Sequence, residues 1–196
     1  AVIEEQTPAI IKGAGVEYQD GDKNDATHLL GKRLLNSHNG VEHFIVNSSN
    51  TSEFVKPKIH RPRDQRLFEP PYVLVPTGVD CDNYKLKAAY SEEAFVARKT
   101  MYIIKGEENQ KSFFLNLVGL LNSSLYSYLN LMTGTSIGIE REQRFMEEVL
   151  AYPYLFSDSV VKMVEAIQKQ LYSGDEFVDT REIVERLDRI ILSEFS

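Results

Sequence analysis

The chain has 196 residues, with 22 Lys and Arg against 29 Asp and Glu, so its formal net charge at pH 7 is −7. This length fits one domain, or one domain with an appendage. Its 42% apolar and 26% charged residues are typical of a soluble globular protein. The acidity argues against a protein that simply coats nucleic acid. The single cysteine, Cys81, excludes an internal disulfide and a cysteine-rich zinc site, and is compatible with a reducing cytoplasm.

The charge is unevenly distributed along the chain. Residues 56–105 carry ten Lys and Arg against six Asp and Glu, a local charge of +4, which leaves −11 for the remainder. An acidic protein with one basic segment suits a bounded polyanion site. The sequence opens on Ala1, without a starting methionine and without the basic and apolar regions of a signal peptide, so we expect a piece of a longer protein.

Glycines follow a short predicted strand at Ala9–Ile11. The segment Lys12–Tyr18 contains Gly13 and Gly15, and a glycine pair after an apolar run raises the possibility of a nucleotide or cofactor loop. Such a loop needs a helix directly after the glycines. Residues 19–25 are instead rich in turn formers, which disfavours that interpretation. Further short strands are predicted at Phe44–Val46 and Phe54–Val55.

The most basic stretch runs from Lys56 to Arg66 and contains five cations and one histidine in eleven residues. Its prolines favour an extended path. An extended basic ribbon can direct guanidinium groups at phosphates or guanine edges. The alternative is a solvated loop whose charges pair with acidic neighbours, and the sequence weighs the two about equally.

A proline pair precedes the next predicted strand, in Glu69-Pro70-Pro71-Tyr72. Adenine methyltransferases use an Asn/Asp/Ser-Pro-Pro-aromatic tetrapeptide that binds and stacks on a flipped adenine. Glutamate is longer and charged, and no convincing cofactor loop precedes it. We therefore expect Tyr72–Val75 to be a buried strand. A half-exposed strand is predicted at Lys85–Tyr90, and one or two strands at Phe95–Ile104.

The longest apolar segment lies between Phe113 and Met132 and is apolar around nearly the whole circumference of a helix, which predicts burial. A glycine-rich loop from Gly134 to Gly138 follows, and then a charged helix starting near Glu140. Thr135, Ser136 and Arg141 in this region are residue types that bind phosphate. The alternative is an ordinary helix-loop-helix.

Two amphipathic helices are predicted at the C-terminal end. Ser157-Asp158-Ser159 can cap the first, which should end near Gly174, and Asp179-Thr180 can cap the second. The four histidines show no metal-ligand spacing, and no Walker loop is present.

The order of these motifs resembles the target-recognition domain of adenine-N6 DNA methyltransferases from restriction-modification systems. The resemblance covers about residues 8–155. It rests on short matches in family order: Lys12–Tyr18, Phe68–Gly78, Lys87–Glu92 followed by Phe95–Arg98, Gly119–Ser123, Gly134–Gly138 with Arg141, and Tyr152-Pro153.

The resemblance implies an α+β fold, in which a twisted, partly barrel-like mixed sheet packs on a buried helix and a C-terminal helical hairpin follows. It implies sequence-specific recognition of double-stranded DNA over residues 1–155, with residues 156–196 as a helical appendage. The chain itself would hold no cofactor. S-adenosylmethionine would belong to an N-terminal methyltransferase domain of the same polypeptide.

Ten residues are predicted to contact DNA on this hypothesis: Lys58, Arg61, Arg63, Arg66, Lys85, Lys87, Arg98, Thr135, Ser136 and Arg141. A second hypothesis is a protein-interaction module that docks a partner subunit through its terminal helices without touching DNA. A third is a freestanding methyltransferase built on Gly13–Gly15 and Glu69–Tyr72. Basic residues scattered over different faces would favour the second.

Overall fold

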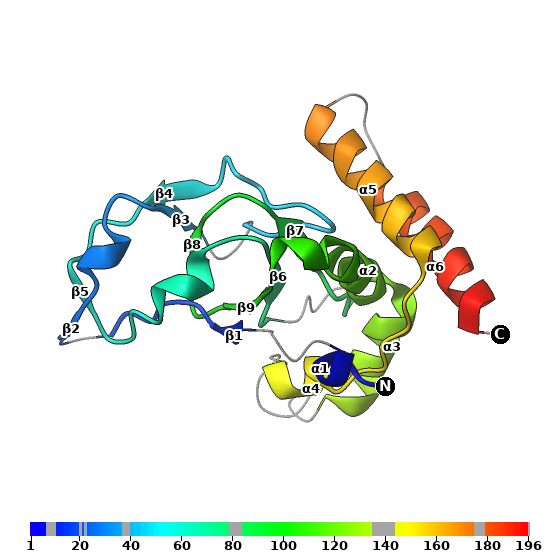
Figure 1. Ribbon diagram of the computed structural model, residues 1–196, viewed down its shortest axis with the longest axis horizontal. Coiled ribbons are helices and arrows are strands. Elements are labelled where there is room, and N and C mark those ends of the chain that lie inside the picture. Colours follow the sequence, from blue (N-terminus) through cyan, green and yellow to red (C-terminus); the bar gives the residue numbers. More distant parts are fainter. Residues whose placement is uncertain are drawn as a thin grey trace.

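The computed structural model describes residues 1–6, 11–19, 21, 23–36, 40–78, 84–134, 144–174 and 179–195. The fold is α+β, with helices gathered at one end and short strands at the other (Figure 1). In the described part of the chain, the sheets do not close into a barrel. None of the described helices is long and apolar enough to cross a membrane.

The central element is a four-stranded antiparallel sheet in the order β1-β9-β6-β7. Its strands are β1 (Ile11–Ala14), β9 (Met101–Lys105), β6 (Tyr72–Pro76) and β7 (Ala89–Ser91). The expected buried strand at Tyr72–Val75 is confirmed, since these residues are at most 1% exposed. Successive side chains of a strand point to opposite faces, so this sheet contributes to two separate hydrophobic clusters.

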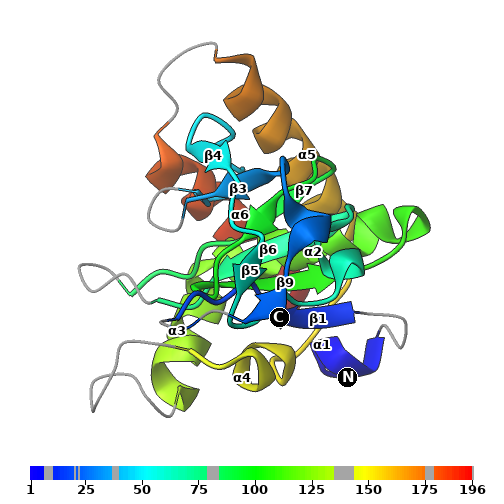
Figure 2. The same cartoon turned by 90° about the vertical axis from the view of Figure 1, so that its left-hand side faces the viewer.

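Short strands complete the end of the molecule that Figure 2 views face-on. A mixed sheet places β3 (Arg33–Leu35) between antiparallel β4 (Thr51–Glu53) and parallel β8 (Val96–Ala97). A separate pair joins β2 (Asn24–Asp25) to β5 (Lys58–Ile59). The prediction of one or two strands at Phe95–Ile104 is confirmed, since β8 and β9 both lie there. The predicted strand at Phe44–Val46 is wrong, because these residues form only isolated bridges.

Short helices connect and flank these strands. They are α1 (Ile3–Gln6), α4 (Met146–Leu150) and the 3-10 helices η1 (Thr27–Leu29), η2 (Gln65–Phe68) and η3 (Glu108–Gln110).

The apolar segment between Phe113 and Met132 forms two helices, where the sequence predicted one. They are α2 (Lys111–Asn122) and α3 (Ser124–Thr133). Ser123 lies between them in an extended conformation, and its Oγ accepts a hydrogen bond from the Tyr126 amide as the N-cap of α3. The chain therefore turns, and α3 keeps part of its apolar surface exposed, including Met132 at 63%.

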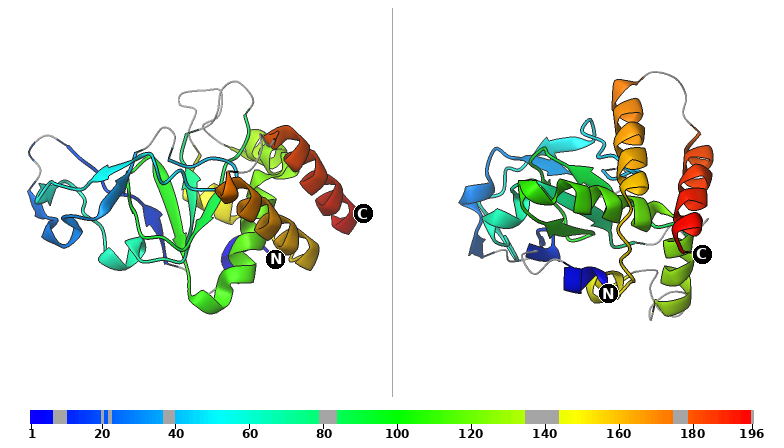
Figure 3. Two further views of the ribbon diagram at one scale, coloured as in Figure 1. Left: turned by 90° about the horizontal axis from the view of Figure 1, so that it is seen from above. Right: turned by 45° about the vertical axis from the view of Figure 1, so that its right-hand side comes forward.

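The predicted terminal helices are confirmed as α5 (Asp158–Ser173) and α6 (Thr180–Phe195), which lie side by side in Figure 3. Ser157 caps α5, and Gly174 ends it with a φ of 69°, in the left-handed region that glycine adopts without strain. Both helices pack with α2 in one hydrophobic cluster against the sheet. The domain boundary near residue 156 stays a prediction.

Candidate nucleic-acid interface

Residues 15–18 extend β1 and lie between two basic segments. On one side, the Val16 N–H donates to the Ala97 carbonyl at 2.8 Å, and the Val16 carbonyl accepts a hydrogen bond from the Lys99 N–H at 2.9 Å. On the other side, Glu17 and Arg61 exchange two backbone hydrogen bonds of 3.1 Å. This pairing brings the basic ribbon next to the turn between β8 and β9, although the two are about 35 residues apart in sequence.

Five cations gather around this extended segment. We call them the basic cluster: Lys56, Arg61, Arg63, Arg98 and Lys99. Lys99 Nζ donates to Glu17 Oε1 at 2.9 Å, and an Arg61 nitrogen lies 3.6 Å from the other carboxylate oxygen. Arg63 Nε donates to the Gly15 carbonyl at 3.1 Å.

Two members of the basic cluster flank an aromatic ring. The Arg98 guanidinium lies 4.2 Å from the centroid of Tyr18, and the Lys56 ammonium lies 4.7 Å from it. Both distances are within cation–π range. One tyrosine therefore holds a cation from the ribbon and a cation from the β8–β9 turn in one neighbourhood.

One described carboxylate, that of Glu17, offsets part of the positive charge of the basic cluster. Glu17 pairs with two of its five cations, and the hydrogen bond from Lys99, helped by the charge of Arg61, lowers the pKa of this carboxyl. Partial burial and the neighbouring Arg61 lower the pKa of Arg63 from its high ordinary value. Arginine nevertheless stays protonated in proteins. Side chains of Arg61 and Lys99 remain 59% and 57% exposed, which leaves them accessible to a polyanion.

Of the ten predicted contact residues, the structure brings together Arg61, Arg63 and Arg98. Lys58 lies nearby in β5, exposed and opposite Asp25 of β2. Arg66 is neutralised by Asp64, whose carboxylate it contacts at 2.6 Å. This ion pair and hydrogen bond lower the pKa of Asp64 to about 2.

The remaining predicted residues divide into two groups. Lys85 and Lys87 lie toward the helices, because the intervening Leu86 amide bonds to Ser127 of α3 and Lys87 lines a cavity of about 200 Å³ with Leu171 of α5. They are not part of the basic cluster. The predicted contacts Thr135, Ser136 and Arg141 lie outside the described residues.

The glycines of the disfavoured cofactor loop instead permit close strand packing. A Cβ on Gly15 would lie 2.2 Å from the Ala97 carbonyl oxygen, and a Cβ on Gly13 would lie 3.3 Å from Leu67. No helix follows them directly in the described residues, since residues 15–17 continue in extended pairing. Gly15 lets the extension of β1 approach the neighbouring backbone closely, and Gly13 leaves space for the Leu67 side chain.

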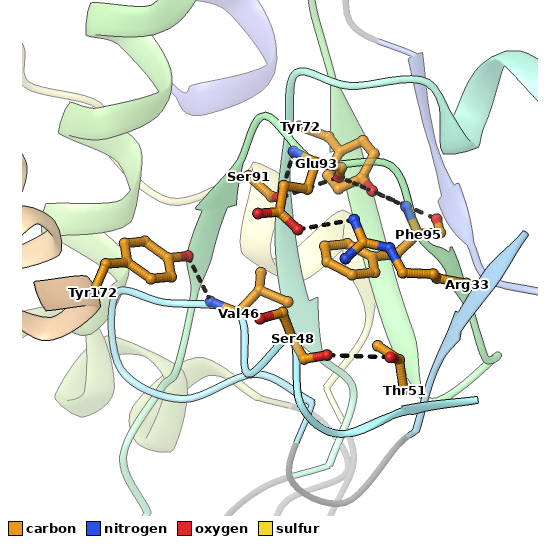
Figure 4. Close-up of polar contacts among 9 residues, drawn as sticks. All are labelled: Arg33, Val46, Ser48, Thr51, Tyr72, Ser91, Glu93, Phe95 and Tyr172. Carbon is orange, nitrogen blue, oxygen red and sulfur yellow. Dashed lines mark hydrogen bonds and ion pairs between the residues drawn. The ribbon is translucent and has the colours of Figure 1, made fainter. Parts of the chain in front are cut away.

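Tyr72 of the Pro-Pro-Tyr motif is used inside the fold. Its ring is buried, and its hydroxyl accepts the Phe95 amide at 2.7 Å and donates to the Glu93 carbonyl at 2.8 Å. Figure 4 shows this junction, in which Arg33 of β3 stacks on Phe95 and pairs with Glu93. The tyrosine therefore ties β6 to the segment before β8.

Sequence reasoning missed four residues of this site: Lys56, Lys99, Glu17 and Tyr18. Lys99 follows Arg98 directly, and Lys56 begins the basic stretch that contains Lys58, so their charge was visible in the sequence. Glu17 and Tyr18 gave no local signal, because their role depends on long-range pairing. Neither models of known protein families nor curated proteins gave a match to this chain.

Proposed function

We propose that this chain is a sequence-specific DNA recognition module of a restriction-modification adenine-N6 DNA methyltransferase. Its partners would be double-stranded DNA and a methyltransferase domain N-terminal to it in the same polypeptide, which would bind S-adenosylmethionine and carry out the reaction in the cytoplasm. The observation that carries the proposal is the basic cluster. Five cations from two distant segments meet around residues 15–18 in a protein of net charge −7.

The physical argument for DNA rests on where these charges lie. An acidic protein is repelled by DNA on most of its surface, so binding requires a local region of the opposite sign. The basic cluster supplies one, beside β5 at the end of the molecule away from α5 and α6 (Figure 1). Exposed lysine and arginine side chains there can replace the counterions of several phosphates. The order of motifs that resembles the recognition domain adds support.

A gel-shift titration with short random-sequence duplexes tests the proposal. The double variant Arg61→Ala, Arg63→Ala should bind at least about tenfold more weakly than the wild type at low salt, because two of the five cations of the cluster are lost. The matched control removes the exposed Lys162 and Lys169 of α5 and should bind like the wild type. Equal affinity of all three proteins would contradict DNA binding through the cluster.

The interaction-module hypothesis predicts a different pattern in the same titration. In that case neither double variant changes DNA binding, because the wild type itself shows none at low salt. Basic residues of the 56–105 segment are divided between the basic cluster and the helical side, where Lys85 and Lys87 lie, and this division is the observation that favours the interaction module. If replacing only Lys85 and Lys87 abolished DNA binding, the DNA-binding site would have to be assigned to the helical side of the molecule.

A further inference from the structure

Arg63 differs from the other four members of the basic cluster in how its backbone and side chain are held. Its φ of 67° lies in the left-handed region, where a residue with a Cβ is strained. It is half-buried, and its Nε donates to the Gly15 carbonyl at 3.1 Å. Such strain persists only where the surroundings fix the conformation.

The backbone around Arg63 is fixed on both sides. Two residues earlier, Arg61 exchanges backbone hydrogen bonds with Glu17. One residue later, Asp64 caps η2, because its Oδ1 accepts the Arg66 amide at 2.9 Å. The left-handed residue provides the turn between these two anchors, and it directs the guanidinium back toward residue 15.

The acceptor of the Arg63 side chain is equally rigid. The Gly15 amide donates to the Met101 carbonyl at 3.0 Å, and this glycine lies so close to the Ala97 and Arg98 carbonyls that it has no space for a Cβ. Because Nε is bound there, the plane of the guanidinium is oriented by the protein. The two terminal nitrogens then form a fork whose direction is set before any ligand arrives.

A fixed fork is suited to reading a base. A phosphate contact needs mainly positive charge, which the exposed Arg61 and Lys99 can supply without a fixed orientation. A guanine presents O6 and N7 as two adjacent acceptors in the major groove, and one arginine fork satisfies both. We propose, on the basis of the function proposed above, that Arg63 is a specificity-determining residue that reads a guanine. The other cluster members would then contact the phosphate backbone of the DNA.

Selection from a random duplex library tests this assignment with two charge-preserving variants. The wild type should enrich a site that contains guanine. Arg63→Lys keeps the charge but loses the fork, so discrimination at one guanine should fall by about ten- to a hundredfold. The salt dependence of binding should stay unchanged. The matched control Arg61→Lys should keep the full site.

A change in the DNA tests the same contact without altering the protein. Replacing the selected guanine by 7-deazaguanine removes the N7 acceptor and should weaken wild-type binding by about tenfold. Full affinity for that duplex, or an unchanged site for Arg63→Lys, would overturn the assignment. A wild type that binds without sequence preference would overturn it and leave DNA binding intact. A wild type that binds no duplex would refute the proposed function first.

Discussion

The two faces of the four-stranded sheet are built in contrasting ways. The helical face carries α2, α5 and α6, whose buried aliphatic residues form one hydrophobic cluster with Val73, Val75 and Ile104 of the sheet. The opposite face, which we call the loop face, is covered by strands of two or three residues and by loops, and the basic cluster lies on that side. The contrast suggests a division of roles, in which apolar helices provide stability and charged loops on a stable support provide binding.

Phe114→Ala should produce the largest effect, on stability alone. The ring is fully buried in α2, 5.3 Å from Phe113 and 6.5 Å from Tyr90 between centroids. Removing it should lower the free energy of unfolding by about 4 kcal/mol, measured by urea denaturation. The half-exposed Phe156 is the control, and its replacement by alanine should cost less than about 1 kcal/mol. Equal losses for both variants would contradict the assigned role of the helical face.

Asn122→Ala should lower the free energy of unfolding by about 3 kcal/mol. This buried amide donates to the Ala88 and Val118 carbonyls and accepts hydrogen bonds from the Ala88 amide. Its loss removes the acceptor of the buried Ala88 amide, in the segment before β7, and one of the two donors to the Ala88 carbonyl, the other being the Phe44 amide. The exposed Asn109 provides the control. A loss below about 1 kcal/mol at Asn122 would show that water or rearrangement replaces these hydrogen bonds.

Gly119→Ala tests how closely the helices approach one another. A Cβ at this position would lie 2.4 Å from Val160 Cγ1 of α5 and 3.1 Å from Val164. Alanine improves helix propensity by about 1 kcal/mol, yet the overlap should make the variant less stable by about 1–2 kcal/mol. Thermal unfolding measures whether the variant is more or less stable than the wild type. Alanine at the exposed Gly78, which has open space around it, should be neutral, and a stabilised Gly119→Ala would contradict this helix packing.

The smallest effect concerns Asp64 and Arg66 on the loop face. Their contact lowers the pKa of Asp64 to about 2 in the folded chain. A depressed carboxyl pKa contributes stability above the unfolded value of about 3.9, and this contribution is lost as the pH falls through the folded value. Arg66→Ala should raise the Asp64 titration midpoint by NMR toward that unfolded value. A midpoint that stays near its original position would show that Arg66 is not the cause.

The helical face was predictable from sequence because its signals are local. Ser157 and Gly174 marked both ends of α5 correctly. The break at Ser123 was missed although the polar residues Asn122–Ser124 interrupt the apolar pattern there, because the cap depends on one serine rotamer. On the loop face, the basic ribbon was visible, but its alignment with Arg98 depends on Glu17 and Tyr18, far away in sequence. Strands of two residues carry too little periodicity to predict such pairing.

The salt dependence of duplex binding tests the central claim most directly. Each phosphate contact contributes about −0.9 to the slope of log K against log salt, so the four cluster cations other than Arg63 predict a wild-type slope of about −4. A variant with alanine at every cluster position except Arg63 should lose most of that slope. A control changes four exposed cations of α5 and α6 instead: Lys162, Lys169, Arg181 and Arg186. The account predicts a wild-type slope for this control, and an equal loss of slope in both variants would contradict it.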